Sequence, residues 1–207
     1  MIKSILITGC SSGIGLESAK TLASRGYQVI ASARNSEDVE RLRSSGLTAI
    51  PLDITDSQSI EKAVELTLEL CHGRIDALFN NAGFGIPGAV EDLNRSTLQA
   101  QFETNVFGPF ELINKILPWM HKQGHGRIIQ NSSVLGFVVL PFRGAYNSSK
   151  FALEGLTDTL RLELRGTNIY VSLIEPGPIT SKFRQNARKA FSKHVSVTSS
   201  RFKNVYE

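Results

Sequence analysis

Short runs of β-branched and other apolar residues alternate with longer amphipathic stretches along most of this 207-residue chain. The runs that we expect to form strands cover residues 2–8, 28–33, 48–52, 77–80, 127–132 and 170–174. The stretches between them have helical spacing, as in the set Ile60, Ala63, Val64, Thr67, Leu68 and Cys71. Strands that are apolar throughout and separated by helices are typical of a parallel sheet that is buried on both faces. We therefore predict one doubly wound α/β domain with helices on both faces of the sheet.

The charge of the chain is unevenly distributed. The chain carries 23 Lys and Arg against 19 Asp and Glu, a net charge of +4, which invites a nucleic-acid-binding hypothesis. However, residues 1–180 contain 16 basic and 18 acidic residues, whereas residues 181–207 contain seven basic residues and one acidic residue. Because the predicted domain, residues 1–180, is slightly acidic and no predicted helix carries a basic stripe, we predict no nucleic-acid partner. Residues 181–207 are predicted to be a basic tail that holds one short helix over 185–193 and then frays.

Cysteine content and apolar runs exclude several other classes. Two cysteines, Cys10 and Cys71, are too few for a disulfide framework and lack metal-ligand spacing, so we predict unpaired thiols in a reducing cytosol and no metal site. The longest apolar run, residues 134–142, contains a Gly and a Pro and falls well short of the ~18 residues of a membrane span. The chain opens on a strand-like run, so we expect no signal peptide and a cytoplasmic location.

Three glycines, Gly9, Gly13 and Gly15, follow the first predicted strand directly, and a predicted helix begins among them. Glycines at such a point permit a tight turn, close approach of the backbone to a pyrophosphate, and close packing of helix on strand. The start of the helix then offers free N–H groups to the phosphates. A plain glycine-rich turn is the alternative, but the position between the first strand and the first helix favours a dinucleotide site.

The spacing Gly-x-x-x-Gly-x-Gly resembles the short-chain dehydrogenase/reductase family, and five further motifs follow in the family's order. Together the six motifs cover residues 8–180. They are closest to the hydroxysteroid and retinol dehydrogenase branch and to related bacterial oxidoreductases. The resemblance implies a Rossmann-like fold and hydride transfer between a nicotinamide cofactor and a carbonyl or alcohol. The five further motifs are Asn80-Asn81-Ala82-Gly83, Asn105 in its Thr-Asn-Val context, Ser133, the Tyr146-x-x-x-Lys150 pair, and Pro176-Gly177.

The resemblance implies a catalytic tetrad of Asn105, Ser133, Tyr146 and Lys150. Tyr146 and Lys150 are four residues apart and share one face of a predicted helix. The lysine ammonium is expected to lower the pKa of the phenol, which then exchanges a proton with the substrate oxygen. Ser133 is expected to hydrogen-bond that oxygen; Ser132 is chemically equivalent, and only the family's 13-residue spacing to the tyrosine selects Ser133. In the family, the asparagine that matches Asn105 holds a water in a proton relay to the lysine.

The end of the second predicted strand bears on the choice of cofactor. NAD-binding proteins place an acidic residue there to bind the ribose 2′-hydroxyl, but this chain reads Ala31-Ser32-Ala33-Arg34-Asn35. Arg34 is suited to pair with a 2′-phosphate, so we predict that NADP(H) is preferred over NAD(H). The residues expected to contact the cofactor are Gly9, Ser11, Ser12, Gly13, Ile14, Gly15, Arg34, Asp53, Ile54, Asn80, Ala82, Gly83, Tyr146, Lys150, Pro176, Gly177, Ile179 and Thr180.

The substrate region of the sequence is mostly apolar. It contains Phe84, Ile86, Phe137, Val138, Leu140 and Phe142, which favours a lipophilic ketone, aldehyde or alcohol. Family members continue after the Pro-Gly motif with a helical lid and a seventh strand, so we expect residues 181–207 to begin a truncated lid and the seventh strand to be missing. The alternative hypothesis is an NADP(H)-binding protein with little or no turnover. The family resemblance also implies a homodimer through the helices predicted over 98–119 and 145–165.

Overall fold

A computed structural model describes residues 3–206. Six parallel strands form one sheet in the order β3-β2-β1-β4-β5-β6. This arrangement confirms the predicted doubly wound α/β fold; residue 2, where the first strand was predicted to begin, lies outside the described residues. The strands are β1 (Ser4–Ile7), β2 (Gln28–Ala33), β3 (Thr48–Pro51), β4 (Ala77–Asn80), β5 (Gly126–Asn131) and β6 (Ile169–Ile174).

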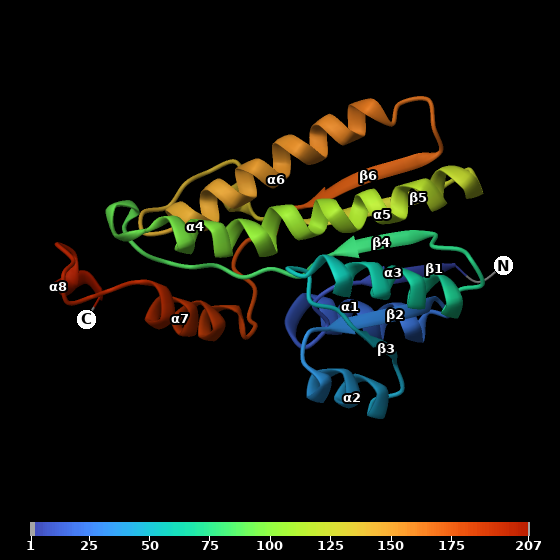
Figure 1. Ribbon diagram of the computed structural model, residues 1–207, viewed down its shortest axis with the longest axis horizontal. Coiled ribbons are helices and arrows are strands. Elements are labelled where there is room, and N and C mark those ends of the chain that lie inside the picture. The colour runs from blue at the N-terminus through green and yellow to red at the C-terminus, as the bar shows by residue number, and fades with distance from the viewer. Residues whose placement is uncertain (1–2, 207) are drawn as a thin grey trace.

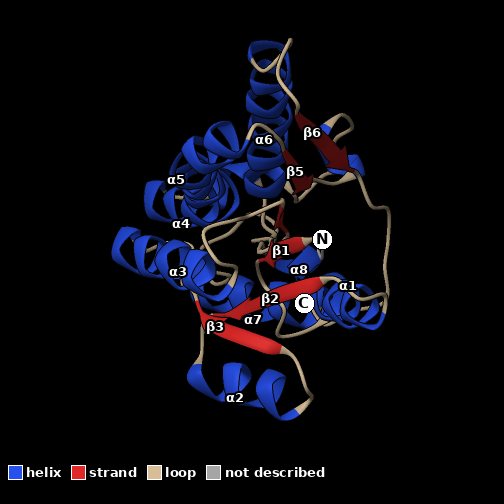
Figure 2. Ribbon diagram, turned by 90° about the vertical axis from the view of Figure 1, so that its right-hand side faces the viewer, coloured by secondary structure: helices blue, strands red, loops and turns tan. Residues whose placement is uncertain are grey.

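Helices cover both faces of the sheet (Figure 1). On one face α1 and α2 pack against the side chains of Ile5, Ile7 and Val29, and on the other face α3 and α5 pack against Leu6 and Leu78. Figure 2 shows α1 and α5 on opposite sides of the strands. The helices are α1 (Gly13–Ser24), α2 (Ser36–Ser44), α3 (Ser57–Leu70), α4 (Arg95–Phe102), α5 (Gly108–Gln123), α6 (Gly144–Glu163), α7 (Phe183–His194) and α8 (Lys203–Tyr206), with a π-helical turn over Glu103–Phe107 between α4 and α5.

The strand order reverses its direction of growth between β1 and β4. The chain builds outward from β1 to β2 and β3, then returns to the other side of β1 for β4, β5 and β6. The connections that leave the carboxyl ends of β1 and β4 therefore lead to helices on opposite faces of the sheet, α1 and α5. In open α/β sheets, ligands bind in the crevice at such a switch point. Local signals fix the helices around it: the Asp56 carboxylate caps α3 by accepting from the Gln58 N–H at 2.8 Å, and Gly124 ends α5 with a left-handed φ of 75°.

The basic tail is more ordered than predicted. The helix expected over 185–193 is confirmed as α7, but the prediction that the chain frays beyond it is wrong. Tyr206 donates a hydrogen bond to Asp92 Oδ2 at 2.6 Å, Ser200 donates to the same oxygen at 2.6 Å, and the Phe202 ring lies 5.3 Å from that of Phe142. Asp92 lies more than a hundred residues before Ser200 and Tyr206, and Phe142 lies in the loop before α6. No periodic pattern within the tail could therefore predict these contacts.

A buried carboxylate lies at the other end of the strands from the switch point, where β1, β4 and β5 begin. Asp76 is 8% exposed and accepts hydrogen bonds from the Ser4 backbone N–H at 2.8 Å and from Arg74 at 2.9 Å, and its Oδ1 lies 2.7 Å from His125 Nε2. Burial by itself would raise the pKa of Asp76, but these hydrogen bonds and the charge of Arg74 hold that pKa well below its usual value. Asp76 therefore fastens the starts of β1, β4 and β5 together.

Within residues 3–206, no helix is both long enough and apolar enough to span a lipid bilayer.

Candidate dinucleotide and catalytic site

The glycine loop lies at the switch point and is folded too tightly for side chains. Gly9 has a φ of +71°, and a Cβ there would lie 2.8 Å from the Cα of Ala82 in the loop after β4. A Cβ at Gly15 would lie 2.5 Å from the carbonyl oxygen of Gly9, while Gly13 has a φ of +61°. The loop after β1 is thus packed closely against the loop after β4, which glycines at these positions permit.

The N-terminus of α1 opens from this loop. Ser12 is the N-cap residue, but its side chain makes no capping hydrogen bond, and the described first turn of α1 contains no acidic residue. The first N–H groups of the helix are therefore not capped by a side chain, and the helix dipole adds partial positive charge at that point. Ser11, Ser12 and Ile14 are all partly exposed beside it. This donor set fits the pyrophosphate of a dinucleotide cofactor.

The carboxyl end of β2 lies directly beside the glycine loop. The Cys10 N–H donates to the Ser32 carbonyl oxygen at 2.8 Å, which holds the two loops together. Arg34 is exposed at the first position after β2. Arg41, from the next helix α2, donates through Nη2 to the carbonyl oxygen of Ser11 at 2.7 Å. Sequence reasoning missed Arg41, because helical spacing alone shows only that it lies on an exposed face.

Two neighbouring residues expected to contact the cofactor, Asp53 and Ile54, are placed differently. Asp53 is partly exposed after β3, with Oδ1 accepting from the Thr55 N–H at 3.0 Å and from its hydroxyl at 2.8 Å. Ile54 is buried, and its carbonyl oxygen would be 1.9 Å from a Cβ at Gly108. Asp53 therefore lies where a ligand can reach it, whereas the Ile54 side chain belongs to the core.

Two asparagines, one at the end of β4 and one in the loop after it, bind this region to its neighbours. Asn80 is buried and donates through Nδ2 to the carbonyl oxygen of Pro109 at 3.1 Å, which anchors α5. Asn81 donates to the Thr8 carbonyl oxygen at 2.9 Å and accepts from Asn131 Nδ2 at 2.9 Å. These bonds cross from β4 to β1 and to β5. Thr8 and Asn131 were not singled out from the sequence, since each is an ordinary polar residue at a strand end.

Tyr146 and Lys150 lie together on α6, as the four-residue spacing predicts. Lys150 Nζ is 5.7 Å from the centroid of the Tyr146 ring and donates to the Asn131 carbonyl oxygen at 2.7 Å. The lysine residue is only 5% exposed. Burial lowers the pKa of Lys150 to about 8, although the nearby Glu154 carboxylate acts in the opposite direction.

The predicted lowering of the Tyr146 pKa is wrong for this structure. Burial raises the pKa of the phenol, and a hydrogen bond with the Ser133 side chain opposes that rise only in part. The physical reason is that the ring is largely desolvated while the Lys150 ammonium is bonded to a backbone carbonyl instead. Tyr146 is therefore a neutral O–H donor at neutral pH.

The two adjacent serines at the end of β5 face different neighbours. Ser133 is the serine whose side chain opposes the rise in the pKa of the Tyr146 phenol, and its hydroxyl oxygen also accepts from the Leu135 N–H at 3.2 Å. The Ser132 hydroxyl oxygen and Glu154 Oε1 both lie 2.9 Å from the position that a Cβ on Gly136 would take. Of the two, Ser133 is thus the serine beside the phenol.

Asn105 sits in the π-helical turn between α4 and α5. Its Nδ2 donates to the Phe84 carbonyl oxygen and to the Ser149 hydroxyl, both at 3.0 Å, and its Oδ1 accepts from the Phe84 N–H at 3.2 Å. A Cβ on Gly83 would lie 3.4 Å from Asn105 Oδ1 and 3.9 Å from Lys150 Nζ. Asn105 and Lys150 therefore approach each other across the space that Gly83 leaves open.

The apolar residues expected around the substrate divide into core and surface. Ile86 is completely buried, whereas Phe137, Val138 and Leu140 are exposed in the loop before α6. Phe183, at the start of α7, lies edge-on to the Tyr146 ring with centroids 5.5 Å apart. Ile86 therefore belongs to the core, and Phe183 is an apolar neighbour of the tyrosine that the sequence did not reveal.

The residues after the Pro-Gly motif connect β6 to α7. The Pro176 carbonyl oxygen accepts from the Val134 N–H at 3.2 Å, which holds this loop against the residue after Ser133. Gly177, Ile179 and Thr180 are exposed. A Cβ on Gly13 would lie 3.3 Å from the Cβ of Ser181, so the loop also reaches the glycine loop.

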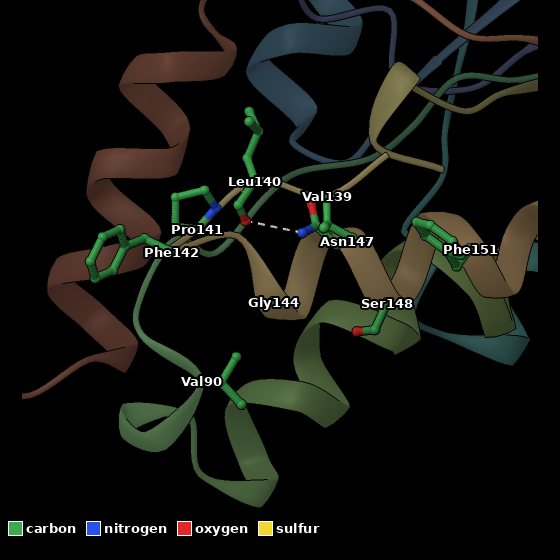
Figure 3. Close-up of a pocket in the computed structure, with 9 residues that line it drawn as sticks. All are labelled: Val90, Val139, Leu140, Pro141, Phe142, Gly144, Asn147, Ser148 and Phe151. Atoms are coloured by element: carbon green, nitrogen blue, oxygen red, sulfur yellow. Dashed lines mark hydrogen bonds between the residues drawn. The ribbon is translucent and has the colours of Figure 1, made fainter. Parts of the chain in front are cut away.

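An open apolar groove of about 480 Å³ lies beside the N-terminal end of α6 (Figure 3). The amide of Asn147 donates to the Leu140 carbonyl oxygen at 3.1 Å along its edge. The lining residues do not include Ser133, Tyr146 or Lys150, so the groove is separate from the candidate catalytic residues. It is lined by Val90, Val139, Leu140, Pro141, Phe142, Gly144, Asn147, Ser148 and Phe151.

Together, the parallel sheet, the switch point and the glycine loop define a Rossmann-type dinucleotide-binding protein. More specifically, the chain belongs to the short chain dehydrogenase family, whose profile matches residues 3–191. It is 46% identical over 192 residues to the uncharacterized oxidoreductase YbbO of Escherichia coli K12, covering 93% of this chain and 71% of that protein. It is 39% identical over 191 residues to human retinol dehydrogenase 8, covering 87% of this chain and 60% of that protein.

Solved structures show the same fold. An actinorhodin polyketide ketoreductase variant with NADPH superposes with a TM-score of 0.84 at 30% identity, covering 99% of this chain and 80% of that one. A short chain dehydrogenase/reductase from Burkholderia phymatum in complex with NAD gives a TM-score of 0.83 at 29% identity, covering 90% of this chain and 69% of that one. The protein is therefore an oxidoreductase of this family by fold and by sequence.

Proposed function

We propose that the protein transfers a hydride between NADP(H) and a lipophilic ketone or aldehyde, or the corresponding alcohol. The observation that carries this proposal is that Ser133, Tyr146 and Lys150 lie close together at the switch point, where the glycine loop also lies. The glycine loop and the uncapped start of α1 fit the pyrophosphate of a dinucleotide. The three side chains supply a hydrogen-bond donor pair for a carbonyl oxygen and a cation behind it.

The cofactor, when bound, supplies or accepts the hydride. In the reducing direction the Tyr146 O–H donates its proton to the carbonyl oxygen as negative charge develops there. Ser133 hydrogen-bonds the same oxygen and orients it. Lys150, buried and near the phenol, stabilises the phenolate that forms, and the Asn105 amide fixes the backbone of Phe84 beside it. Oxidation of an alcohol uses the same groups in reverse.

The buried lysine predicts a pH limb in this reaction. Because the pKa of Lys150 is lowered to about 8, its ammonium is present below that pH and is lost as the pH rises through it. We therefore expect kcat for carbonyl reduction to fall as pH rises through about 8, measured as NADPH consumption under saturating conditions. Residual turnover of Lys150→Met should lack this limb. A flat profile in the unmodified protein, or the same limb in the variant, would contradict the assignment.

We propose a preference for NADP(H) from the charge at the end of β2. Arg34 is exposed there, and the chain places no carboxylate between Ala31 and Asn35. Replacing Arg34 with Asp should shift the preference toward NADH, since a carboxylate repels a 2′-phosphate and accepts hydrogen bonds from a ribose hydroxyl. The ratio of kcat/KM for NADPH to that for NADH measures the shift. Equal use of both cofactors by the unmodified protein would refute the proposed preference.

A second candidate function is NADP(H) binding with little or no turnover. It is favoured by the position of the apolar groove, whose lining residues do not include Ser133, Tyr146 or Lys150. A screen of lipophilic ketones and aldehydes, with NADPH binding followed by calorimetry, separates the two functions. Binding together with NADPH oxidation supports the enzyme, whereas binding without oxidation against the whole panel supports the second candidate.

We also propose a homodimer through α4, α5 and α6. These helices leave large apolar side chains exposed on the surface, which suits association with a second copy. The exposed side chains on these helices are Leu98, Trp119, Phe151, Leu156 and Leu162, and Phe107 in the π-helical turn between α4 and α5 is exposed as well.

A further inference from the structure

Arg41 joins helix α2 to the loop that follows β1. It projects from α2, the helix that follows β2, and its Nη2 donates to the carbonyl oxygen of Ser11 in the loop that follows β1. The distance is 2.7 Å, so this is a well-formed bond from helix to loop rather than a chance approach. Through its Nη1 the same guanidinium pairs with Asp38 at 2.6 Å.

The position of this guanidinium matters because β1 and β2 are adjacent in the sheet. The Cys10 N–H bonds to the Ser32 carbonyl oxygen, so the glycine loop and the end of β2 are neighbours. In dinucleotide-binding folds the ribose of the adenosine half lies between these two loops. Arg34 is on the β2 side of that space, and Arg41 spans to the glycine-loop side.

We propose that Arg41 is a second cation of the site that binds the 2′-phosphate of NADP(H), held in place by Asp38 and by the Ser11 carbonyl. This inference rests on the NADP(H) function proposed above. A guanidinium has five N–H donors, and two bonds to protein leave donors for a phosphate. The Arg41 side chain is 55% exposed, so these donors are accessible. Asp38 fixes the guanidinium and is itself neutralised by it.

An ordinary surface ion pair is the competing explanation, and α2 contains such a pair for comparison. Arg43 bonds Glu40 at 2.6 Å with the same three-residue spacing, and its side chain is 49% exposed. However, its Nε donates to the Ala49 carbonyl oxygen on β3, not to the glycine loop. Arg41 and Arg43 therefore lie on the same helix, are similarly exposed, and each pair with a carboxylate. They differ in what they reach, since Arg41 bonds to the glycine loop and Arg43 bonds to β3.

The test compares binding of 2′,5′-ADP and 5′-AMP by calorimetry, because these nucleotides differ only by the 2′-phosphate. The unmodified protein should bind 2′,5′-ADP more tightly. Arg41→Ala should weaken 2′,5′-ADP binding by about tenfold or more and leave 5′-AMP binding within about twofold, since a charge-assisted pair with the phosphate is lost. Arg43→Ala should change neither affinity. Adding Asp38→Asn to Arg41→Ala should restore part of the loss, because the unpaired carboxylate that repels the phosphate is removed.

The possible failures are distinguishable. If the unmodified protein discriminates between the two nucleotides but Arg41→Ala discriminates equally well, the role of Arg41 is refuted and the proposed cofactor stands. The role of Arg41 is also refuted, and the proposed cofactor also stands, if Arg43→Ala weakens 2′,5′-ADP binding as much as Arg41→Ala does. If the unmodified protein binds both nucleotides equally, or neither of them, the NADP(H) preference fails and the Arg41 proposal fails with it.

Discussion

Replacement of Tyr146 with Phe should lower kcat by about a hundredfold to ten-thousandfold, the range that a positioned proton donor contributes. The ring and its edge-on contact with Phe183 remain, so the packing of α6 and α7 is preserved. Only the phenolic O–H, whose pKa the Ser133 side chain influences, is removed. NADPH affinity, measured by calorimetry, should stay within about twofold, because the phosphate contacts come from the glycine loop and the start of α1.

The matched control for this change is Tyr170→Phe. Tyr170 is an exposed residue of β6 that stacks on Arg127 and lies in none of the candidate site loops. It should leave kcat unchanged. Turnover of Tyr146→Phe at the rate of this control would overturn the catalytic assignment.

Replacement of Asp76 with Asn should lower the free energy of unfolding by about 2–3 kcal/mol at neutral pH. The carboxylate accepts hydrogen bonds from Ser4 and Arg74 and lies against His125, and an amide cannot satisfy all of these groups. Urea unfolding followed by circular dichroism measures the loss. Because Asp76 joins the starts of three strands far from the glycine loop, the remaining folded protein should bind NADPH normally.

The effect of Asp76 should depend on pH with a definite sign. The folded-state pKa of Asp76 is lowered, so its contribution to stability is present above its usual pKa of about 4 and is lost as the pH falls further. The difference between the unmodified protein and Asp76→Asn should therefore shrink below about pH 4. Glu61→Gln, which removes an exposed ion pair with Lys115, should cost only about 0–1 kcal/mol at any pH. A cost for Asp76→Asn no larger than this control would contradict the structural role.

The sequence predicted the parts of the fold that are encoded locally. The six apolar runs form the six strands, and the central strand β1 is buried on both faces, as Ile5 and Leu6 illustrate on its two sides. The glycine loop was predictable because a Cβ at Gly9 or Gly15 would overlap backbone atoms of neighbouring segments, which restricts those positions to glycine. The family resemblance selected Tyr146 and Lys150, and their four-residue spacing correctly predicted that they share one face of a helix.

Features that depend on distant contacts were missed. Asp76 meets Ser4 across 72 residues, and Tyr206 meets Asp92 across 114, so neither cluster has a local pattern. The sign of the Tyr146 pKa shift was also wrong, since spacing shows that a lysine is near but not that burial dominates or that Asn131 holds the ammonium. The role of Arg41 depends on which loop the side chain reaches, which helical spacing does not specify.

The most direct test of the proposed function is isotope transfer from NADPH that carries one deuterium on C4 of the nicotinamide, the carbon from which the hydride leaves. Each diastereomer of the labelled cofactor is incubated with the protein and a panel of lipophilic ketones and aldehydes, and the product alcohols are examined by mass spectrometry. The proposed function predicts one deuterium on the carbinol carbon from one diastereomer with the unmodified protein, and almost none with Tyr146→Phe. Binding of NADPH without deuterium in any product, or equal transfer by the two proteins, would contradict it.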